Sequence, residues 1–505
     1  MFDRTVNVEQ GLLQGIAAAN PYITVYRGIP YAKPPVGELR WRAPQPPEPW
    51  EGVRMADTFG AMPPQIEMHY GGQENAAPRN VSEDCLYLNI WTPAKSGDDR
   101  LGVMVWYHGG GYQTGSAVDL IFDGQRLAEK GIIIVTVGYR LGVLGYYCHP
   151  DMERESPYGT AGNFGLMDQA FALGWVHRNI ASFGGDPEKI TIAGQSAGAA
   201  SVCNLMCSPL ASGLFRQAIC QSGDGLMRME MEYARALKLG KQLSDALGDG
   251  SLRSMRNLSA SDLVRSDYDA AREVTGAMFT PVTDHVVLRP MAEALLHGTL
   301  NTRVPMIFGT NREEGLGGED IESALNAFGE DRSLVEREFP YRNEQERRVA
   351  TARLGNELWY ARDIFWARHR EQALGMPTWH YQFCRPASIN GHEIGAVHSV
   401  EMPFLFESYY QFGVFDVKPG DPVIASNLAT YWANFVANGD PNGPGLAPWP
   451  SKGDAPDKHM CFDARIGMAE DIYDERIAAE VRFWEKSLLH KSCIKSSFDK
   501  LEEMT

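Results

Sequence analysis

The stretch ITIAGQSAGAAS, from Ile190 to Ser201, places one serine between a strand-like run and a helix-forming run. The residues before Ser196 are apolar and rich in β-branched side chains, whereas alanines dominate after it. A G-x-S-x-G pattern at such a junction is typical of a nucleophile elbow, a tight turn that lifts a serine hydroxyl into a cleft. The pattern alone is also compatible with a structural serine in a βα turn, but the flanking strand and helix favour the nucleophile.

Strand-like and helix-like segments alternate on both sides of this turn. Residues 165–185 carry apolar side chains at spacings of three and four, and Gly-Gly-Asp-Pro at 184–187 terminates the run, which is typical of a helix and its stop. Short apolar runs, typical of buried parallel strands, occur at 102–108, 131–139, 189–194, 304–309 and 378–384. The alternation predicts an α/β fold with a mostly parallel central sheet and helices on both faces.

The domain organisation follows from the two regions that interrupt this alternation. Residues 225–300 and 315–375 are long, charged and mostly helical in pattern. Because no shift in composition marks an independent unit, we expect a single catalytic domain over 1–505, in which these two regions are helical insertions that cap the sheet.

Composition excludes some classes of partner and compartment. The chain has 505 residues and a net charge of −17, which disfavours binding to nucleic acid or to an anionic membrane surface. The first residues do not have the pattern of a signal peptide. The sequence contains no stretch of 18 apolar residues, so it predicts no membrane span. The 8 cysteines form no C-x-x-C pair. These features predict a cytoplasmic protein in a reducing environment, and they leave its oligomeric state open.

A second glycine-rich segment, WYHGGGYQTG at 106–115, follows another apolar run. Three consecutive glycines allow backbone N–H groups to point outward, where a hydrolase needs donors for a developing oxyanion. A flexible turn has the same composition, but His108 before the glycines and Tyr112 after them favour the catalytic interpretation. No G-K-[ST] sequence follows, which disfavours a phosphate-binding loop.

Candidates for the acid and the base follow the serine in the chain order of this architecture. Glu313 and Glu314 come directly after the strand-like run 304–309, and His392 and His398 come after the run 378–384. Loops that follow parallel strands lie at the same edge of the sheet, where the cleft is expected. His398 precedes an apolar run, which indicates a packed loop, whereas His392 lies among polar residues.

Several motifs along the chain resemble one family. These are YRGIPYAKPPVGELRWRAPQ (26–45), SEDCLYLNIWTP (82–93), HGGGY (108–112), GQSAGA (194–199), GTNREEG (309–315) and HSVEMPF (398–404). Together they resemble the type-B carboxylesterases, which include para-nitrobenzyl esterases, animal carboxylesterases and cholinesterases. The resemblance implies an α/β-hydrolase fold whose helical insertions cap an active-site gorge.

The resemblance also implies roles for individual residues. It implies a serine hydrolase that acts on small-molecule carboxylic esters and needs no metal or organic cofactor. Hydrolysis of carbamates or amides by the same groups is the alternative, and a non-enzymatic, cholinesterase-like binding protein is disfavoured because the catalytic groups are all present. The implied residues are the nucleophile Ser196, the acid Glu314, the base His398, the oxyanion donors Gly110, Gly111 and Ala197, and Ser222 as a neighbour of the acid and base.

The chain departs from the family pattern in three places. Gln195 stands where the family usually has glutamate, which removes a negative charge beside the nucleophile. Cys85 has no cysteine in the preceding segment with which to form the disulfide of secreted relatives, and the segment 65–81 has no tryptophan for a choline cation. We therefore disfavour a choline ester, and we expect the insertions, Tyr112 and Phe279 to shape the substrate pocket.

Overall fold

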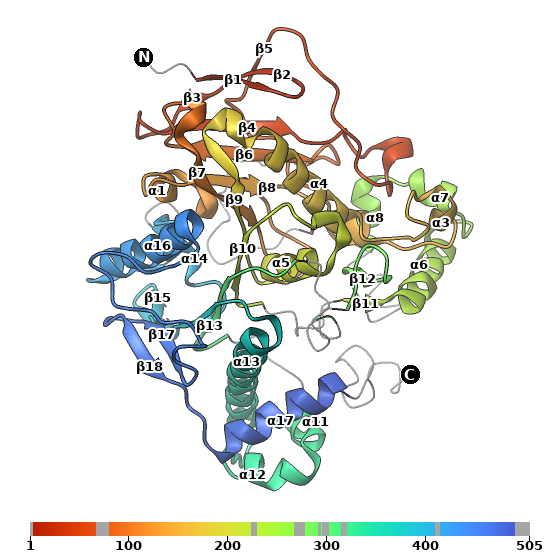
Figure 1. The fold of residues 1–505 in the computed structure, drawn as a ribbon. Coiled ribbons are helices and arrows are strands. Elements are labelled where there is room, and N and C mark those ends of the chain that lie inside the picture. Colours follow the sequence, from red (N-terminus) through yellow and green to blue (C-terminus); the bar gives the residue numbers. More distant parts are fainter. Residues whose placement is uncertain are drawn as a thin grey trace.

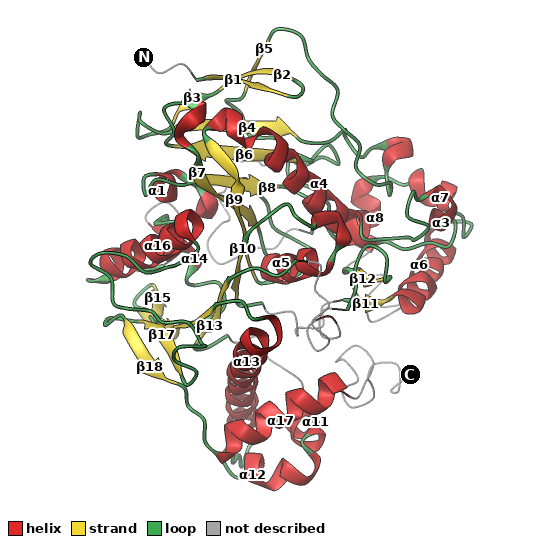
Figure 2. Ribbon diagram, viewed as in Figure 1, coloured by secondary structure: helices red, strands yellow, loops and turns green. Residues whose placement is uncertain are grey.

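The computed structural model describes residues 4–66, 80–223, 230–266, 278–290, 294, 302–314, 321–409 and 415–489. One large sheet runs through the molecule, and helices lie on both of its sides (Figures 1 and 2). Its strands are β3 Ile16–Ala17, β4 Thr24–Pro30, β6 Tyr87–Thr92, β7 Leu101–Tyr107, β8 Ile133–Val137, β9 Gly185–Gln195, β10 Gln217–Gln221, β13 Met306–Asn311, β14 Thr378–Phe383, β17 Lys458–Phe462 and β18 Gly467–Glu470.

The order of these strands shows that the centre of the sheet is parallel. The order is β18-β17-β14-β13-β10-β9-β7-β8-β6-β4-β3. Every pair from β17 to β8 is parallel, whereas the pairs at the two edges are antiparallel. The predicted α/β class and the mostly parallel sheet are therefore confirmed.

Smaller strand groups and the helices surround this sheet. Strands β1 Thr5–Val8, β2 Gly11–Gln14 and β5 Val53–Met55 form a separate sheet, β11 Met231–Glu232 pairs with β12 Val282–Thr283, and β15 Ala387–Ile389 pairs with β16 His392–Gly395. The α-helices are α1 Gln125–Ala128, α2 Gly142–Tyr146, α3 Met152–Glu155, α4 Phe164–Asn179, α5 Ala197–Cys207, α6 Tyr233–Leu247, α7 Leu252–Arg256, α8 Ala260–Ser266, α11 Ile321–Ala327, α12 Arg332–Glu336, α13 Glu344–Leu374, α14 Met402–Leu405, α16 Asp421–Asn438 and α17 Glu475–Leu489.

The sheet is buried on both faces, which explains the continuous apolar runs of its strands. Along β7, Val103 and Val105 belong to one core cluster, which includes side chains of α4 and α5. Met104 and Trp106 belong to the other cluster, which includes side chains of α16. Successive side chains of a strand point to opposite faces, so helices on both sides require apolar residues at every position. Figure 1 shows α4 and α5 on one side of the sheet and α16 on the other.

The two predicted insertion regions differ in their relation to the sheet. Helices α6, α7 and α8 lie within 225–300 and stand away from the central strands in Figure 1. Within 315–375, α13 contacts both β13 and β14, the two parallel strands that it connects. It thus covers the sheet as a crossover helix does. The assignment of one domain with two capping insertions stays a prediction.

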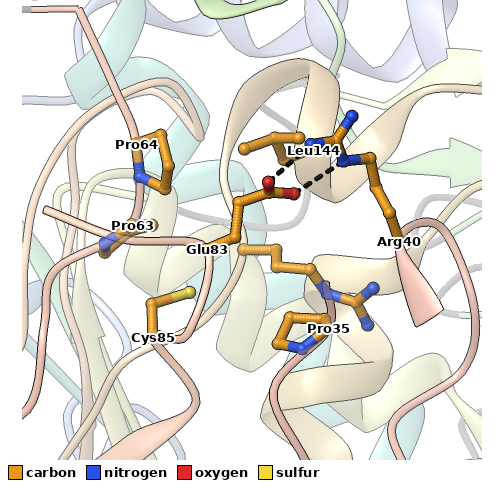
Figure 3. Close-up of a pocket in the computed structure, with 8 residues that line it drawn as sticks. Pro35, Arg40, Pro63, Pro64, Glu83, Cys85 and Leu144 are labelled. Atoms are coloured by element: carbon orange, nitrogen blue, oxygen red, sulfur yellow. Dashed lines mark hydrogen bonds and ion pairs between the residues drawn. The ribbon is translucent and has the colours of Figure 1, made fainter. Parts of the chain in front are cut away.

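The surroundings of Cys85 bear on the expected absence of its disulfide. Its thiol is buried in a small pocket beside the Arg40–Glu83 ion pair (Figure 3), and burial raises the pKa of this thiol. The other lining residues are Pro35, Pro63, Pro64, Arg140 and Leu144, so no second cysteine lines the pocket. None of the seven cysteines in the described ranges takes part in a disulfide bond.

Among the described residues, none of the helices combines the length and the apolar character that crossing a membrane requires.

Candidate active site

The serine of the G-x-S-x-G pattern occupies a strained turn between β9 and α5. Ser196 has φ 57° and ψ −126°, a conformation that non-glycine residues rarely adopt. A Cβ at Gly194 would lie 2.4 Å from the carbonyl carbon of Gly198, and a Cβ at Gly198 would lie 2.0 Å from the carbonyl oxygen of Tyr107. Only glycine therefore fits on either side of the serine, and this close approach holds the strained turn in place.

The glycine run after β7 lies against this serine. A Cβ at Gly109 would come within 3.1 Å of the Ser196 Cβ, and Gly110 and Gly111 have φ values of 110° and 62°. Within the described part of the chain, the backbone N–H groups of Gly110, Gly111 and Ala197 donate to no protein acceptor. The N–H of Ala197 is one of the first of α5, where no carbonyl precedes it in the helix. The three predicted oxyanion donors are thus available to a ligand.

The structure brings His398 and Glu314 together. The Nδ1 atom of His398 lies 2.5 Å from Oε2 of Glu314, and the backbone N–H of Asn311 donates to Oε1 of Glu314 at 2.7 Å. Glu314 is buried. A carboxylate only accepts hydrogen bonds, so this contact places the proton of a neutral imidazole on Nδ1. Nε2 is then left as the basic nitrogen.

The electrostatic surroundings favour the protonated form of His398. Burial lowers its pKa, but the hydrogen bond that His398 donates to Glu314, the charge of Glu314 and the charge of Glu401 together outweigh burial and raise the pKa above its usual value. A protonated His398 imidazole is therefore stabilised by two neighbouring carboxyl groups.

A buried polar network fixes the loop that carries His398. The side-chain amide of Asn311 donates to the carbonyl of Val397 and to Oε2 of Glu401, both at 2.7 Å. Gln221 Nε2 donates to the other oxygen of Glu401 at 3.2 Å. Sequence reasoning missed Asn311, Gln221 and Glu401. A signal was available for two of them, because Asn311 and Gln221 are the last residues of β13 and β10, at the carboxyl edge of the sheet.

The remaining acid and base candidates lie elsewhere. Glu313 accepts the backbone N–H of Ala396 at 2.7 Å and pairs with Arg312, so it binds the loop rather than the imidazole. His392 is exposed at the start of β16. The geometry therefore groups Glu314 with His398 and leaves Glu313 and His392 outside the pair.

Gln195 faces His398 directly. Its Nε2 atom lies 3.2 Å from Nε2 of His398, and its side chain is buried. With Nδ1 protonated, the amide donates to the lone pair of the His398 Nε2 atom. Between these described residues, no hydrogen bond joins the Ser196 hydroxyl to His398. The Gln195 amide thus occupies the Nε2 lone pair of His398.

The other predicted site residues are all buried. The hydroxyl of Ser222, the residue directly after β10, has no hydrogen-bond partner in the described part of the chain, and the residue has φ 50°. Tyr112 packs edge-on against Tyr146, and Phe279 packs against Tyr147. Both aromatic side chains belong to the core. Their role as pocket walls and the role of Ser222 beside the acid and base stay predictions.

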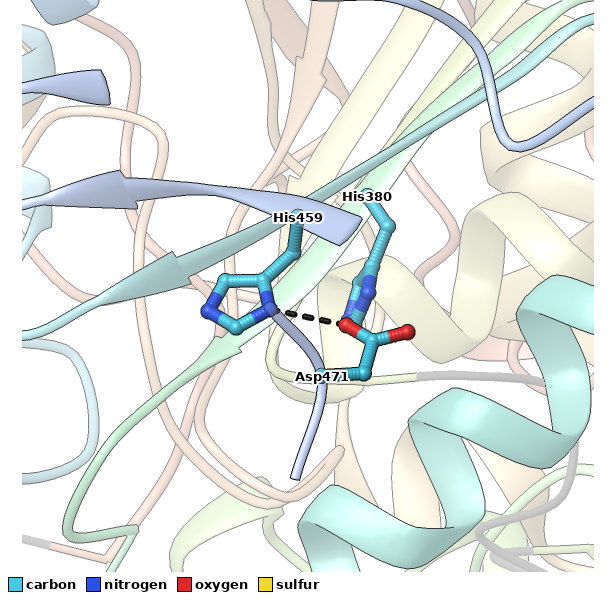
Figure 4. A group of neighbouring side chains, drawn as sticks. All are labelled: His380, His459 and Asp471. Carbon is cyan, nitrogen blue, oxygen red and sulfur yellow. Dashed lines mark hydrogen bonds and ion pairs between the residues drawn. The ribbon is translucent and has the colours of Figure 1, made fainter. Parts of the chain in front are cut away.

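One buried cluster away from this pair has residues of the metal-binding type. His380, His459 and Asp471 lie close together (Figure 4), and neither nitrogen of His380 has a hydrogen-bond partner among the described residues. The ammonium of Lys452, however, lies 2.7 Å from Asp471 and is buried with it. This ammonium already supplies the positive charge that the carboxylate needs. Burial and the charge of Lys452 lower the pKa of His380. The expectation that no metal is required stays a prediction.

The fold and the turn at Ser196 define an α/β-hydrolase. The comparisons with known proteins identify the family, because its model, described as the carboxylesterase family, matches residues 3–340 and 320–484. This chain belongs to the carboxylesterase family and, within it, to the type-B carboxylesterases. It is an esterase that hydrolyses carboxylic ester bonds.

Individual relatives match nearly the whole chain. A fumonisin B1 esterase from Sphingopyxis macrogoltabida is 32% identical over 92% of this chain and 87% of its own length. The para-nitrobenzyl esterase of Bacillus subtilis is 30% identical over 94% of this chain and 98% of its own. Among solved structures, a carboxylesterase from Geobacillus stearothermophilus is 32% identical, with a TM-score of 0.73 over 94% of this chain and 99% of that one.

Proposed function

We propose that this esterase acts through an acyl-enzyme formed on Ser196. His398 accepts the proton of the Ser196 hydroxyl at Nε2 as the oxygen attacks the ester carbonyl. Glu314 holds the imidazole in the required tautomer and stabilises the imidazolium. The observation that carries this proposal is the 2.5 Å contact of His398 with Glu314 in loops at the same sheet edge as the strained serine.

The second half of the reaction uses the same groups. The oxyanion of each tetrahedral intermediate is stabilised by the N–H groups of Gly110, Gly111 and Ala197. His398 passes its proton to the departing alcohol, and the same nitrogen then activates the water that hydrolyses the acyl-enzyme. No step of this sequence calls for a metal or an organic cofactor.

The Gln195 contact requires one rearrangement. Ser196 must replace the Gln195 amide at Nε2 of His398 before the proton can move, because one lone pair serves one donor. When the carbonyl oxygen of a substrate ester binds to the oxyanion donors, the Ser196 hydroxyl is positioned to donate its hydrogen bond to His398. We propose that this exchange accompanies substrate binding.

Covalent trapping tests the proposal directly. A fluorophosphonate reacts with activated serines, so incubation is expected to add one phosphonyl group, and peptide mass spectrometry is expected to place it on Ser196. Labelling should disappear in Glu314→Gln and His398→Asn variants that keep the native fold. A label on another serine, or equal labelling of the denatured protein, would contradict the mechanism. A panel of matched esters, carbamates and anilides decides between an ester hydrolase and the alternative activities.

Gln195 provides a prediction about pH. In a Gln195→Glu variant, a negative charge faces the His398 imidazole and favours its protonated form. The pKa of the base rises, so the acid limb of the kcat/KM profile should move to higher pH. A Gln195→Met variant, which has a similar volume and no charge, should show a smaller shift. An unchanged acid limb in a folded, active Gln195→Glu variant would mean that the charge at position 195 does not alter the pKa of His398.

The cellular location of the protein is also a proposal. We propose a cytoplasmic location, which the free state of all seven described cysteines supports, since oxidising compartments favour disulfides. The acidic net charge supports a small-molecule substrate over nucleic acid as the partner.

A further inference from the structure

Trp359 is a partly exposed tryptophan beside the base. Its ring centroid lies 6.1 Å from that of His398, and the two ring planes are inclined at 63°. Trp366, on the same helix α13, is fully buried, as are most of the described tryptophans. Trp359 instead keeps part of its surface open to solvent. A large apolar ring that stays partly exposed next to reacting groups is typical of the wall of a ligand site.

The position of this indole is well fixed. The guanidinium of Arg362, three residues further along α13, lies 4.3 Å from the centroid of the Trp359 ring. The next residue, Tyr360, is buried, and its hydroxyl accepts the backbone N–H of Ile472 at 2.9 Å. A ring held in this way loses little conformational entropy when a ligand packs against it.

The chemistry of the reaction indicates which part of the substrate lies beside Trp359. Nδ1 of His398 is bound to Glu314, so Nε2 is the atom that donates a proton to the leaving alcohol. That alcohol oxygen must come within hydrogen-bond reach of the imidazole. The acyl carbon, in contrast, is bound to Ser196. The side chain that contacts the imidazole is therefore best placed to meet the alcohol part of the ester.

We propose that Trp359 forms the leaving-group wall of the substrate site and selects esters whose alcohol part carries a flat aromatic ring. This inference rests on the proposed function, because it takes the direction of proton transfer from that mechanism. Aromatic pairs gain energy beyond the burial of their area, so the indole should raise kcat/KM for such esters by about two- to tenfold.

A paired set of substrates tests the proposal. Benzyl acetate and ethyl acetate share the acyl group and have alcohols of similar acidity, so the ratio of their kcat/KM values reports on the alcohol side. Ethyl phenylacetate and ethyl acetate share the alcohol and differ by an aromatic ring on the acyl side, so the ratio of their kcat/KM values reports on the acyl side. In Trp359→Leu, the first ratio should fall by about two- to tenfold and the second should stay unchanged. Trp359→Phe should keep most of the first ratio, and Trp50→Leu, a change at another partly exposed tryptophan, should alter neither.

The other outcomes overturn the inference in distinguishable ways. A fall in the acyl-side ratio would mean that Trp359 contacts the acyl part of the ester. An equal loss for every ester would mean that the indole only supports His398. Wild-type protein that turns over none of the esters would instead refute the proposed function.

A measurement on the wild-type protein tests the proposal even if the Trp359 variants do not fold. Benzyl alcohol should inhibit the wild-type enzyme more strongly than cyclohexylmethanol, because the two have similar size and only one has a flat ring. Equal inhibition by the two alcohols would overturn the proposal.

Discussion

Replacing Ser196 with alanine is expected to lower kcat for an aryl acetate by roughly 10⁴- to 10⁶-fold. The variant keeps the Cβ atom and removes only the hydroxyl, so no acyl-enzyme can form. Its fold should be unchanged, because Gly194 and Gly198 still permit the close approach that holds the turn. Steady-state hydrolysis and thermal unfolding of the same preparation measure both effects.

A matched control separates loss of the nucleophile from a general effect of the substitution. Ser212 is exposed and lies beyond α5, so Ser212→Ala should keep wild-type kcat and wild-type stability. Ser196→Ala should also lose its reaction with fluorophosphonates. A Ser196→Ala protein that keeps activity within about tenfold of wild type would remove Ser196 from the mechanism.

The elbow could be predicted from the sequence because its requirements are local. The turn needs small residues at Gly194 and Gly198, where any Cβ would meet backbone within 2.4 Å, and these positions are fixed relative to the serine. The strands were predictable for a related reason. A strand covered on both faces is apolar at most positions, so β7, β8 and the first part of β13 stand out as short apolar runs.

The surroundings of the base could not be predicted in the same way. Glu313 and Glu314 are adjacent and follow the same strand, so residue type and spacing alone leave both open. Only the path of the loop decides that Glu314 meets His398 and that Glu313 meets the backbone of Ala396. The contact between Gln195 and His398 joins residues about 200 positions apart, and it depends on how that loop returns to the sheet.

The aromatic residues show a different limit. Tyr112 follows the glycine run, and its expected role in the pocket stays a prediction, because its side chain is fully buried against Tyr146. Cores and ligand pockets recruit the same large apolar side chains, so composition does not separate them. Trp359 lies in the middle of a long helix, and nothing in the sequence around it indicated that its ring lies beside His398.

The two histidines that follow β14 should differ sharply when each is replaced by alanine. His398→Ala should lower kcat by roughly 10⁴- to 10⁶-fold, because Ser196 loses its base. His392→Ala should stay close to wild type, since this side chain is exposed on β16. Measurement of kcat and kcat/KM for one aryl acetate compares the two variants.

The stability of the base variant must be examined separately, because His398→Ala leaves the buried Glu314 carboxylate without its 2.5 Å partner. Loss of a partner to a buried charge destabilises a protein by about 3–5 kcal/mol. His398→Asn supplies an amide donor for Glu314 and no base, so it should unfold closer to the wild-type temperature while remaining inactive. Added imidazole should restore part of the activity of His398→Ala, because a free base can enter the vacated space. An active His398→Asn together with an inactive, folded His392→Ala would move the base to His392 and contradict the geometry.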